Sequence, residues 1–396
     1  MYHFSYLLFV TIFLTVALTA ISFITEYKKS RAVRPTAGTK FRQVRTVAVL
    51  IASKNGEKTI AAAVAAARKT RCAVFVVSDG STDHTAKIAR QAGATVLALR
   101  KNVGKPRALH RAYRYFALGA RYDAIAILDD DVLIEKDFIR HAKLAMDGNC
   151  AIAVGHNVTN WPHAQRWNMW VASRAYSYWS YQLTLRSIQS AYNVMTCISG
   201  SNSLYRTPVL DHVLVKQTPY IVDDTYWTLE THRLQLGTIH YAPKARAWLQ
   251  DPTNFKDWYK QNLRWMWGTF QGILGHRIGT RFNRFHISYL LLMVDWAVYI
   301  LSGPLTVFVI WQAGVRHLPF ALALLCLGYA VWAVAAAIAL RRPRLLLFLP
   351  AIIVTDFLFR WIMIHGLVKA LRQRTVASCV WESPARFETK LSSAKA

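Results

Sequence analysis

The pattern of hydrophobic and polar positions divides the chain into three parts. In the middle part, short apolar runs rich in Val and Ile alternate with segments of helical periodicity, and clusters of Gly, Asn and Asp separate them. Both ends of the chain instead carry apolar runs of about the 20 residues that are needed to cross a bilayer. We therefore expect a soluble α/β domain between membrane segments.

The middle part predicts four strands that alternate with three helices. The strands are expected at residues 46–53, 73–81, 94–100 and 123–131, and the helices at residues 59–69, 82–93 and 105–120. Such alternation predicts a mostly parallel sheet with helices on both faces. Ligands of these sheets bind at the carboxyl ends of strands, which is where Asp79 and three consecutive aspartates, Asp129 to Asp131, are expected.

The first apolar run covers residues 6–24, and the basic sequence KKSRAVRPTAGTKFRQVR follows it closely. No positively charged segment precedes the run and no small-residue cleavage site is evident, which favours a membrane helix within residues 1–27 over a cleaved signal peptide. Because positive flanks stay in the cytoplasm, residues 28–45 are expected to be a basic cytoplasmic linker, and the domain that follows is expected to be cytoplasmic.

Three further apolar runs lie near the other end, at residues 287–311, 318–340 and 345–367. The basic sequence RRPR separates the last two and is expected in the cytoplasm. Four full spans would place the basic tail, residues 371–396, outside, against the positive-inside rule. One of the membrane helices expected within residues 285–370 is therefore predicted to be re-entrant or interfacial.

Three ionisable residues fall inside these apolar runs: Asp295, Asp356 and Arg360. Charges within a membrane are costly and often functional. Two interpretations stay open at this point, because the three residues could line a polymer channel or pair with one another.

The composition favours membrane lipids as partners. Lys and Arg number 49 against 21 Asp and Glu, which gives a formal net charge of +28 at pH 7. The basic residues accompany the membrane segments and no nucleic-acid recognition motif is present, so anionic lipid headgroups are expected partners and nucleic acid is not. The five cysteines have no paired spacing, which argues against a zinc ribbon or a disulfide framework and suits a reducing compartment.

Five short motifs follow one another along the chain: VSDGSTD, NVGKPRAL, LDDD, VDDTYW and QNLRW. In this order they resemble the membrane-embedded family 2 glycosyltransferases of the GT-A fold, which include hyaluronan, chitin, cellulose and poly-N-acetylglucosamine synthases. The resemblance covers residues 46–267 by motif and the membrane segments by layout. It implies a Rossmann-like, mostly parallel GT-A domain at residues 46–250 and amphipathic interfacial helices at residues 251–284.

The resemblance assigns the aspartate cluster to a metal and a nucleotide. The D-x-D motif of the family matches Asp129 to Asp131. Oxygen ligands suit Mg²⁺ or Mn²⁺, which neutralises the diphosphate as the glycosidic bond breaks. Strand alternation predicts that Asp129 and Asp131 point the same way, with Asp131 on the metal and Asp129 on the metal or the ribose. The alternative interpretation is a solvated turn.

Further residues resemble the family's nucleotide and diphosphate site. The sequence IASKNGE matches the family's first-strand motif in part, which makes Ala52 and Ser53 candidates for base contacts and gives Glu57 an uncertain role. The resemblance also implies that Asp79 binds uracil or ribose and that Lys105 approaches the diphosphate. Both residues also have a structural interpretation. Asp79 could be a turn residue before Gly80, and Lys105 could be an exposed loop lysine.

The sequence VDD stands where the family has T-E-D. The third position is kept, so Asp224 is the expected catalytic base, which deprotonates the acceptor hydroxyl in a single inverting displacement. Asp223 is the expected base instead if the register of the motif differs by one residue. The structural interpretation is an acidic pair at a helix N-terminus, which the helix dipole favours. Upstream, the sequence CISGSNSLYR resembles a segment that ends in a basic residue, Arg206, near the acceptor, with Gly200 allowing close approach.

The Q-x-x-R-W motif consists of Gln261, Arg264 and Trp265. By resemblance Arg264 binds the diphosphate, Trp265 offers its flat face to a sugar and Gln261 bonds to acceptor or nucleotide. The same stretch also reads as an amphipathic helix on the bilayer surface, and both interpretations hold together. The aromatic-rich residues 161–192 are expected to line an acceptor path, rest on the bilayer or pack in the core.

These observations predict an inner-membrane enzyme with a cytoplasmic catalytic domain. The expected reaction transfers a sugar from a UDP-sugar, with UDP-N-acetylglucosamine as first choice, to a polysaccharide that leaves through the membrane helices. A lipid monoglycosyltransferase is the nearest alternative. A non-catalytic scaffold or a donor-binding pseudoenzyme is the alternative outside the enzyme class, because two motifs are altered.

Overall fold

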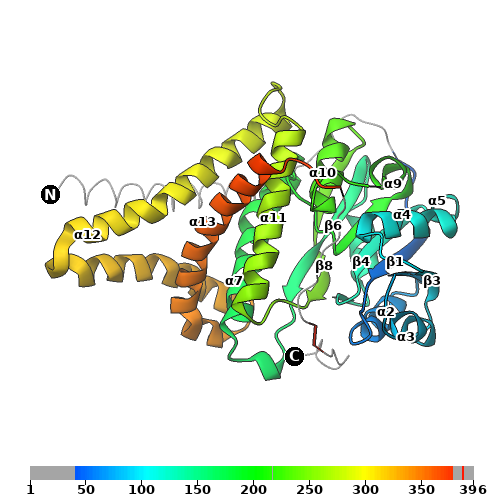
Figure 1. Ribbon diagram of the computed structural model, residues 1–396, viewed down its shortest axis with the longest axis horizontal. Helices are drawn as coiled ribbons and strands as arrows, with labels where there is room; N and C mark the ends of the chain where they lie inside the picture. Colours follow the sequence, from blue (N-terminus) through cyan, green and yellow to red (C-terminus); the bar gives the residue numbers. More distant parts are fainter. Residues whose placement is uncertain (1–40, 216, 378–385, 388–396) are drawn as a thin grey trace.

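The computed structural model of the protein describes residues 41–215, 217–377 and 386–387 (Figure 1). The membrane helix expected within residues 1–27 and most of the basic linker lie outside the described residues, and so does most of the basic tail.

Eight strands form one mixed sheet in the described part of the chain, in the order β3-β2-β1-β4-β7-β6-β8-β5. The strands are β1 (Val47–Ser53), β2 (Ala73–Asp79), β3 (Thr95–Leu99), β4 (Ala124–Asp129), β5 (Leu133–Ile134), β6 (Cys150–Thr159), β7 (Asn202–Arg206) and β8 (Thr238–Leu249). Strands β1 to β4 pair in parallel, as do β6 and β8, whereas β7 runs antiparallel to both β4 and β6, and β5 runs antiparallel to β8. The four predicted strands and the mostly parallel sheet are confirmed.

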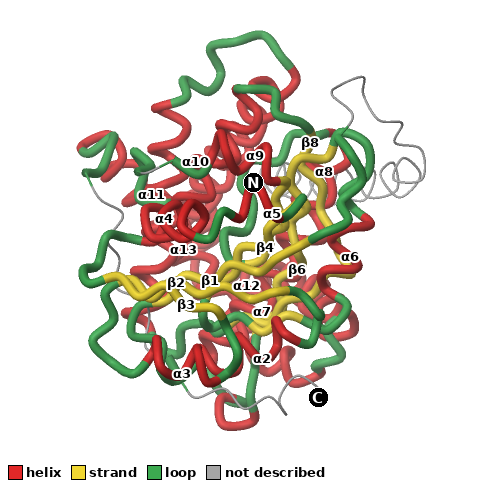
Figure 2. Tube along the Cα trace, turned by 90° about the vertical axis from the view of Figure 1, so that its right-hand side faces the viewer, coloured by secondary structure: helices red, strands yellow, loops and turns green. Residues whose placement is uncertain are grey.

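Helices cover both faces of the sheet because its central strands are buried on both sides. The helices are α2 (Ile60–Arg68), α3 (Thr85–Gln91), α4 (Lys105–Tyr115), α5 (Leu118–Arg121), α6 (Phe138–Leu144), α7 (Met169–Tyr181), α8 (Ser187–Tyr192), α9 (Thr207–Val213), α10 (Asp223–Arg233), α11 (Phe255–Gly275), α12 (Arg284–Ala339) and α13 (Leu349–Arg372). Val49 and Ile51 of β1 pack under α2 and α3, and Leu50 faces α4. Figure 2 shows these two helix layers on opposite sides of the strands.

One predicted helix is divided in the structure. The single helix expected at residues 105–120 is observed as α4 and α5, because Ala117 between them has a left-handed backbone with φ of 50°. A second turn in the left-handed region, Gly80 with φ of 62°, follows β2. A Cβ atom there would lie 2.3 Å from the backbone nitrogen of Asn102, so only glycine fits this turn.

Three helical segments of the described chain are long and apolar enough to cross a membrane: Arg284–Phe308, Leu318–Ala339 and Pro343–Arg372. Figure 1 shows that α12, which contains the first two, runs away from the sheet and bends sharply back toward it. Its sequence includes Pro304 and Pro319, which interrupt helical hydrogen bonding. The basic sequence RRPR, residues 341–344, stands between α12 and α13, as the hydrophobic pattern predicts.

Two of the charges within the apolar runs are paired. The guanidinium of Arg360 contacts the carboxylate of Asp356 one turn away on α13, and the hydroxyl of Tyr299 donates to Asp356 Oδ1 at 2.7 Å. Tyr329 from the second half of α12 also bonds to this carboxylate. Asp356 and Arg360 therefore fasten the membrane helices together, whereas Asp295 is exposed on α12.

Candidate active site

The carboxyl ends of the parallel strands bring the predicted polar residues to one edge of the sheet. Ala52 near the end of β1 pairs with Asp129 at the end of β4, and Ser53 pairs with Ser78, which precedes Asp79 in β2. The parallel pairing thus gathers residues that are far apart in sequence, which is the arrangement that such sheets use for ligands.

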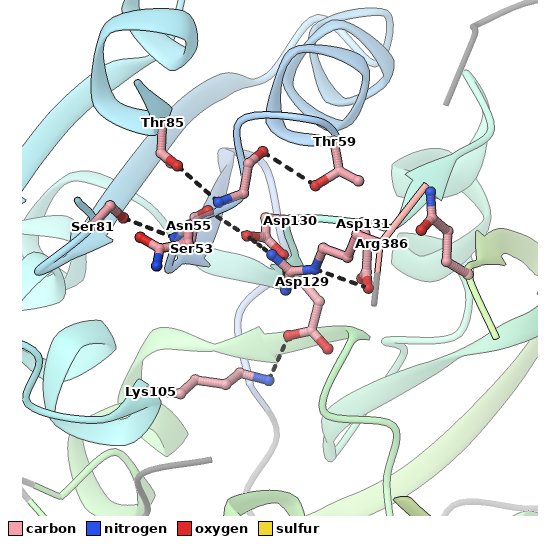
Figure 3. A network of polar contacts seen from close by, with 12 residues as sticks. Ser53, Asn55, Thr59, Ser81, Thr85, Lys105, Asp129, Asp130, Asp131 and Arg386 are labelled. Atoms are coloured by element: carbon pink, nitrogen blue, oxygen red, sulfur yellow. Dashed lines mark hydrogen bonds and ion pairs between the residues drawn. The ribbon is translucent and has the colours of Figure 1, made fainter. Parts of the chain in front are cut away.

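The three consecutive aspartates have different surroundings (Figure 3). The carboxylate of Asp129 lies 2.7 Å from Nζ of Lys105. Asp130 is 1% exposed, contacts the Ser53 hydroxyl and forms an ion pair of 2.6 Å with Arg386. Asp131 lies 3.7 Å from the Nε atom of the same arginine. The chain therefore packs three carboxylates around two cations.

Strand alternation does not decide where Asp131 points, because β4 ends at Asp129. The prediction that Asp129 and Asp131 share a face for this reason is wrong. In the turn after β4, Asp131 shares Arg386 with Asp130, while Asp129 contacts Lys105.

Carboxylate crowding makes this turn suited to a divalent cation. Burial raises the pKa of Asp131 to about 7, the charges of Asp130 and Asp129 act in the same direction, and the guanidinium of Arg386 opposes them. Within the described residues no three His, Cys, Asp or Glu side chains surround one metal position. The donor set fits a Mg²⁺-like ion, which binds one or two carboxylates and completes its shell with phosphate oxygens and water.

Lys105 is the first residue of α4 and lies between the two halves of the site. Besides Asp129, its Nζ atom donates to the carbonyl oxygen of Gly200 at 3.1 Å. Burial acts to lower the pKa of Lys105, but the carboxylates of Asp129, Asp223 and Asp224 raise it, so the side chain is a permanent cation. The interpretation as an exposed loop lysine is therefore wrong.

Asp79 holds the loop that leads into α4. It is 4% exposed, and its two oxygens accept the backbone N–H groups of Val103 at 2.8 Å and Gly104 at 2.9 Å. Burial raises the pKa of Asp79, and these two hydrogen bonds oppose the shift. This contact orients Lys105, while a contact of Asp79 with uracil or ribose stays a prediction.

Glu57 is exposed and belongs to a loop that is tied to the start of α3. Its carboxylate accepts the backbone N–H of His84 at 3.3 Å, and its own N–H donates to Asp83 at 3.2 Å. These bonds fix the loop after β1, which also carries Ser53. The expected base contacts of Ala52 and Ser53 stay predictions.

Asp223 and Asp224 form the first turn of α10, opposite Lys105. The backbone N–H of Gly200 donates to Asp224 Oδ2 at 3.1 Å, and a Cβ atom on Gly200 would lie 2.9 Å from that oxygen. Glycine therefore permits the close approach that the sequence suggested. Oδ2 of Asp223 is buried without a hydrogen-bond partner within the described residues, so it can accept one from a ligand.

The environment of Asp224 suits a general base. Burial raises its pKa to about 6, and the charge of Asp223 acts in the same direction. The cations of Lys105 and Arg264 oppose the shift, which places Arg264 of α11 close enough to act on this carboxylate. A base with this pKa is ionised at pH 7 and still accepts a proton readily.

The Q-x-x-R-W residues lie on α11, which packs lengthwise against α13 (Figure 1). Oε1 of Gln261 accepts a hydrogen bond of 2.8 Å from Arg174 of α7. The ring of Trp265 packs beside Ile221 and Val222, directly before Asp223. The predicted interfacial helix thus runs alongside both a membrane helix and the segment that holds the acidic pair.

Two arginines of the site were not predicted from the sequence. Arg386 was treated as part of a basic tail, yet it binds Asp130, and Phe387 beside it forms two backbone hydrogen bonds with the Gln250 side chain. Arg174 lies inside the aromatic-rich stretch. No local pattern marks either arginine, because each acts on partners that are distant in sequence.

Arg206 does not lie near the acceptor side. It pairs with Ala124, the first residue of β4, whereas Asp129 ends that strand. Its guanidinium donates to three backbone carbonyls, those of Cys150, Met146 and Arg42. The antiparallel direction of β7 carries it to the opposite edge of the sheet, so its role is structural.

Comparison with solved structures identifies the fold. The mannosyltransferase PcManGT from Pyrobaculum calidifontis, in complex with GDP-Man and Mn²⁺, matches with a TM-score of 0.56 at 17% identity, covering 91% of this chain and 98% of that one. Poly-beta-1,6-N-acetyl-D-glucosamine synthase of Staphylococcus epidermidis is 24% identical over 294 residues, which span 69% of this chain and 67% of the synthase. Hyaluronan synthase 1 of Xenopus tropicalis is 28% identical over 170 residues, 41% of this chain and 28% of that protein.

The mixed sheet has the GT-A fold of the solved mannosyltransferase structure, and membrane-type helices are attached to it. The model of the family described as glycosyltransferase like family 2 matches residues 45–268, more than half of the chain, and the chain belongs to this family. The resemblance, the fold class and the enzyme class predicted from the sequence are confirmed.

Proposed function

We propose that this glycosyltransferase moves a sugar from a UDP-sugar, first of all UDP-N-acetylglucosamine, to the hydroxyl of a growing polysaccharide. The bridge that Lys105 forms between Asp129 and Gly200 carries the proposal. It places the aspartate cluster, where a diphosphate and its metal would bind, on one side of a cation, and Asp224 on the other. The polysaccharide synthases among the relatives support the choice of donor and product.

In the proposed reaction Asp224 accepts the proton of the acceptor hydroxyl. The acceptor oxygen forms a bond to the anomeric carbon while the bond from that carbon to the diphosphate oxygen breaks, and the nucleoside diphosphate leaves. One displacement of this kind inverts the anomeric centre. Lys105 and Arg264 stabilise the charge that develops on the departing diphosphate.

A Mg²⁺ or Mn²⁺ ion would be held by Asp129 and Asp131 and would supply a Lewis acid beside the diphosphate. Asp223, with its unpaired buried oxygen, would accept a hydrogen bond from the acceptor sugar. Gln261 and Trp265 would bind the acceptor on the α11 side, where a flat ring face suits a sugar.

The enzyme is proposed to be embedded in the inner membrane with its catalytic domain in the cytoplasm. The three apolar segments support membrane embedding, and the basic residues beside them support the orientation. The compact membrane part, with three such segments in the described chain, also favours the second candidate, a lipid monoglycosyltransferase.

Product size tests the proposal. The purified protein in proteoliposomes receives Mn²⁺ and a panel of radiolabelled nucleotide sugars, including UDP-N-acetylglucosamine, UDP-glucose and GDP-mannose. The proposal predicts label in long polymer from UDP-N-acetylglucosamine. Label confined to a single-sugar lipid would replace it with the second candidate, and transfer from GDP-mannose alone would overturn the choice of donor.

A further inference from the structure

A buried arginine on α7 contacts two of the three Q-x-x-R-W residues. Arg174 is 4% exposed, and its Nη2 atom donates to Gln261 Oε1 at 2.8 Å. The carbon at the centre of its guanidinium lies 4.7 Å from the centre of the Trp265 ring. The same side chain also donates from Nη1 to Asn262 Oδ1 at 3.2 Å.

The position of Arg174 is itself fixed. Its Nε atom lies 3.5 Å from Oδ1 of Asp251, which is 4% exposed and follows β8. The ring of Tyr178, one turn later on α7, lies 5.4 Å from the guanidinium on which it packs. A planar group held by an ion pair, two hydrogen bonds and two aromatic rings has one orientation, which a flexible lysine cannot reproduce.

The hydrogen bond from Arg174 decides which way the Gln261 amide faces. An amide oxygen and nitrogen can exchange places by rotation, but only the oxygen accepts from a guanidinium. With Oε1 held toward Arg174, the Nε2 group of Gln261 keeps two N–H donors for a ligand. The ring of Trp265 is held in the same way, because its face covers the guanidinium.

We propose that Arg174 is a positioning residue that sets Gln261 as a hydrogen-bond donor and orients the Trp265 ring for the acceptor sugar. The proposal rests on the proposed function, because it needs an acceptor at the α11 side of the site. It adds that the acceptor presents an oxygen, a hydroxyl or ring oxygen, to the Gln261 amide.

The variant Arg174→Lys tests this role against a matched control. Arg206→Lys alters another buried arginine, 3% exposed, which bonds only to backbone carbonyls in the contacts described above. In the proteoliposome assay with UDP-N-acetylglucosamine, Arg174→Lys is expected to lower kcat by roughly 10- to 100-fold, with the donor KM changed by less than about threefold. Arg206→Lys is expected to lower Tm and leave kcat within about twofold of wild type. Equal kcat losses in the two variants would overturn the positioning role.

A second variant keeps the fold while removing the donor. Gln261→Glu retains an oxygen for Arg174 and strengthens that contact with a charge, but it has no N–H to offer. We expect Tm at or above that of wild type and a loss in kcat of about tenfold or more. Full activity of Gln261→Glu would contradict the proposal, even if Arg174→Lys fails to fold.

A double-mutant cycle separates positioning from simple packing. Because Arg174 acts in part through Gln261 and in part through Trp265, the combined loss of kcat in Arg174→Lys with Gln261→Ala is expected to be smaller than the product of the two single losses. Additive losses would show that the two residues act independently and would refute the proposal. If the wild-type protein transfers no sugar from any donor, the proposed function is wrong. This result is distinct from failure of the positioning role, because it is obtained without any variant.

Discussion

At the scale of single residues, Lys105 connects the proposed donor and acceptor halves of the site. Its ammonium group contacts Asp129 and donates a hydrogen bond to the carbonyl oxygen of Gly200. The negative charges of Asp223 and Asp224 stabilise its protonated form. The loop held by Asp79 places it there. A cation between a diphosphate site and a general base lowers the energy of the leaving group and keeps the base ionised at neutral pH.

Replacing Lys105 by Met removes this charge and keeps the length of the side chain. We expect kcat/KM for the nucleotide sugar to fall roughly 100-fold or more, which is the usual effect of losing one preorganised group at a developing anion. Lys101→Met changes an exposed lysine of the same loop and serves as the control. Similar activity of the two variants in steady-state assays would contradict the role of Lys105.

The pKa of Asp224 predicts a pH dependence. In the proposed reaction Asp224 accepts a proton, which it can do only when ionised, and burial together with the charge of Asp223 raises its pKa to about 6. Below pH 6 the protonated fraction grows, so kcat/KM falls by about tenfold per pH unit, whereas above pH 7 it levels off. The acidic side of the pH profile of kcat/KM measures this decrease directly.

The variant Asp223→Asn should shift the acidic side of the same pH profile. Removing the neighbouring negative charge lowers the pKa of Asp224, so half-maximal kcat/KM moves to lower pH. The other titratable groups that interact with Asp224 include Lys105, Arg264, Cys197, Tyr181 and Tyr205, and all of these are retained in this variant. If the pH of half-maximal kcat/KM stays the same or rises in this variant, ionisation of Asp224 does not cause the decrease in activity at low pH.

At the scale of elements, the site depends on how α10 and α11 are aligned. Glu230 of α10 accepts from His276 directly after α11 at 2.8 Å and pairs with Arg233 at 2.6 Å. Gln271 of α11 also accepts the N–H of Ile221 just before α10 at 2.9 Å. These contacts hold the helix that carries Asp224 beside the helix that carries Gln261, Arg264 and Trp265.

Glu230→Gln weakens this alignment. Burial acts to raise the pKa of Glu230, but the hydrogen bonds from His276 and Arg233 lower it to about 2. A lowered carboxylate pKa stabilises the fold above the unfolded value of about 4.3, and the stabilisation is lost as pH falls from there toward 2. We expect a loss of roughly 1–3 kcal/mol at pH 7, seen as a lower Tm.

The difference in Tm between wild type and Glu230→Gln should narrow as pH falls from 5 toward 3. Asp137→Asn alters an exposed pair with Arg140 and should change Tm little at any of these pH values. A Tm difference that is constant with pH would indicate that the carboxylate charge is not what aligns the two helices.

At the scale of the whole molecule, segments distant in sequence close the site from two sides. Helix α7 packs Ala172 against Ala336 and Leu345 of the membrane part, while Arg174 on the same helix reaches Gln261. The other side is formed by Arg386, which is 256 residues from its partner Asp130. The membrane helices and the end of the chain therefore contribute to the geometry of the catalytic edge.

Arg386 and a divalent cation should compete for the carboxylate of Asp131, which Arg386 contacts together with Asp130. We expect Mn²⁺ to raise Tm in the absence of nucleotide, and Arg386→Ala to enlarge that rise, because the variant leaves Asp130 and Asp131 without their guanidinium. Arg374→Ala, an exposed arginine after α13, is the control. A thermal shift titration in which Arg386→Ala shows no response to Mn²⁺ would contradict a metal site at these aspartates.

Local patterns predicted the parts of this architecture that depend on local interactions. The strands β1 to β4 follow from continuous apolar runs. The family motifs place Asp129 at the end of a strand and Asp224 at the start of a helix, as observed, while the roles of both residues stay predictions. The antiparallel strand β7 could not be placed, so Arg206 was expected at the wrong edge. Arg174 and Arg386 were missed because tertiary packing determines their partners, and the spacing of residues along the sequence does not indicate which residues pack together.

Donor binding and turnover in Asp224→Asn test the proposed roles of the two halves of the site. This variant is expected to bind the nucleotide sugar with Mn²⁺ within about threefold of the wild-type Kd, while kcat falls roughly 1,000-fold, as expected for loss of a general base. Turnover close to that of wild type, or loss of donor binding together with turnover, would show that Asp224 does not deprotonate the acceptor beside a separate diphosphate site.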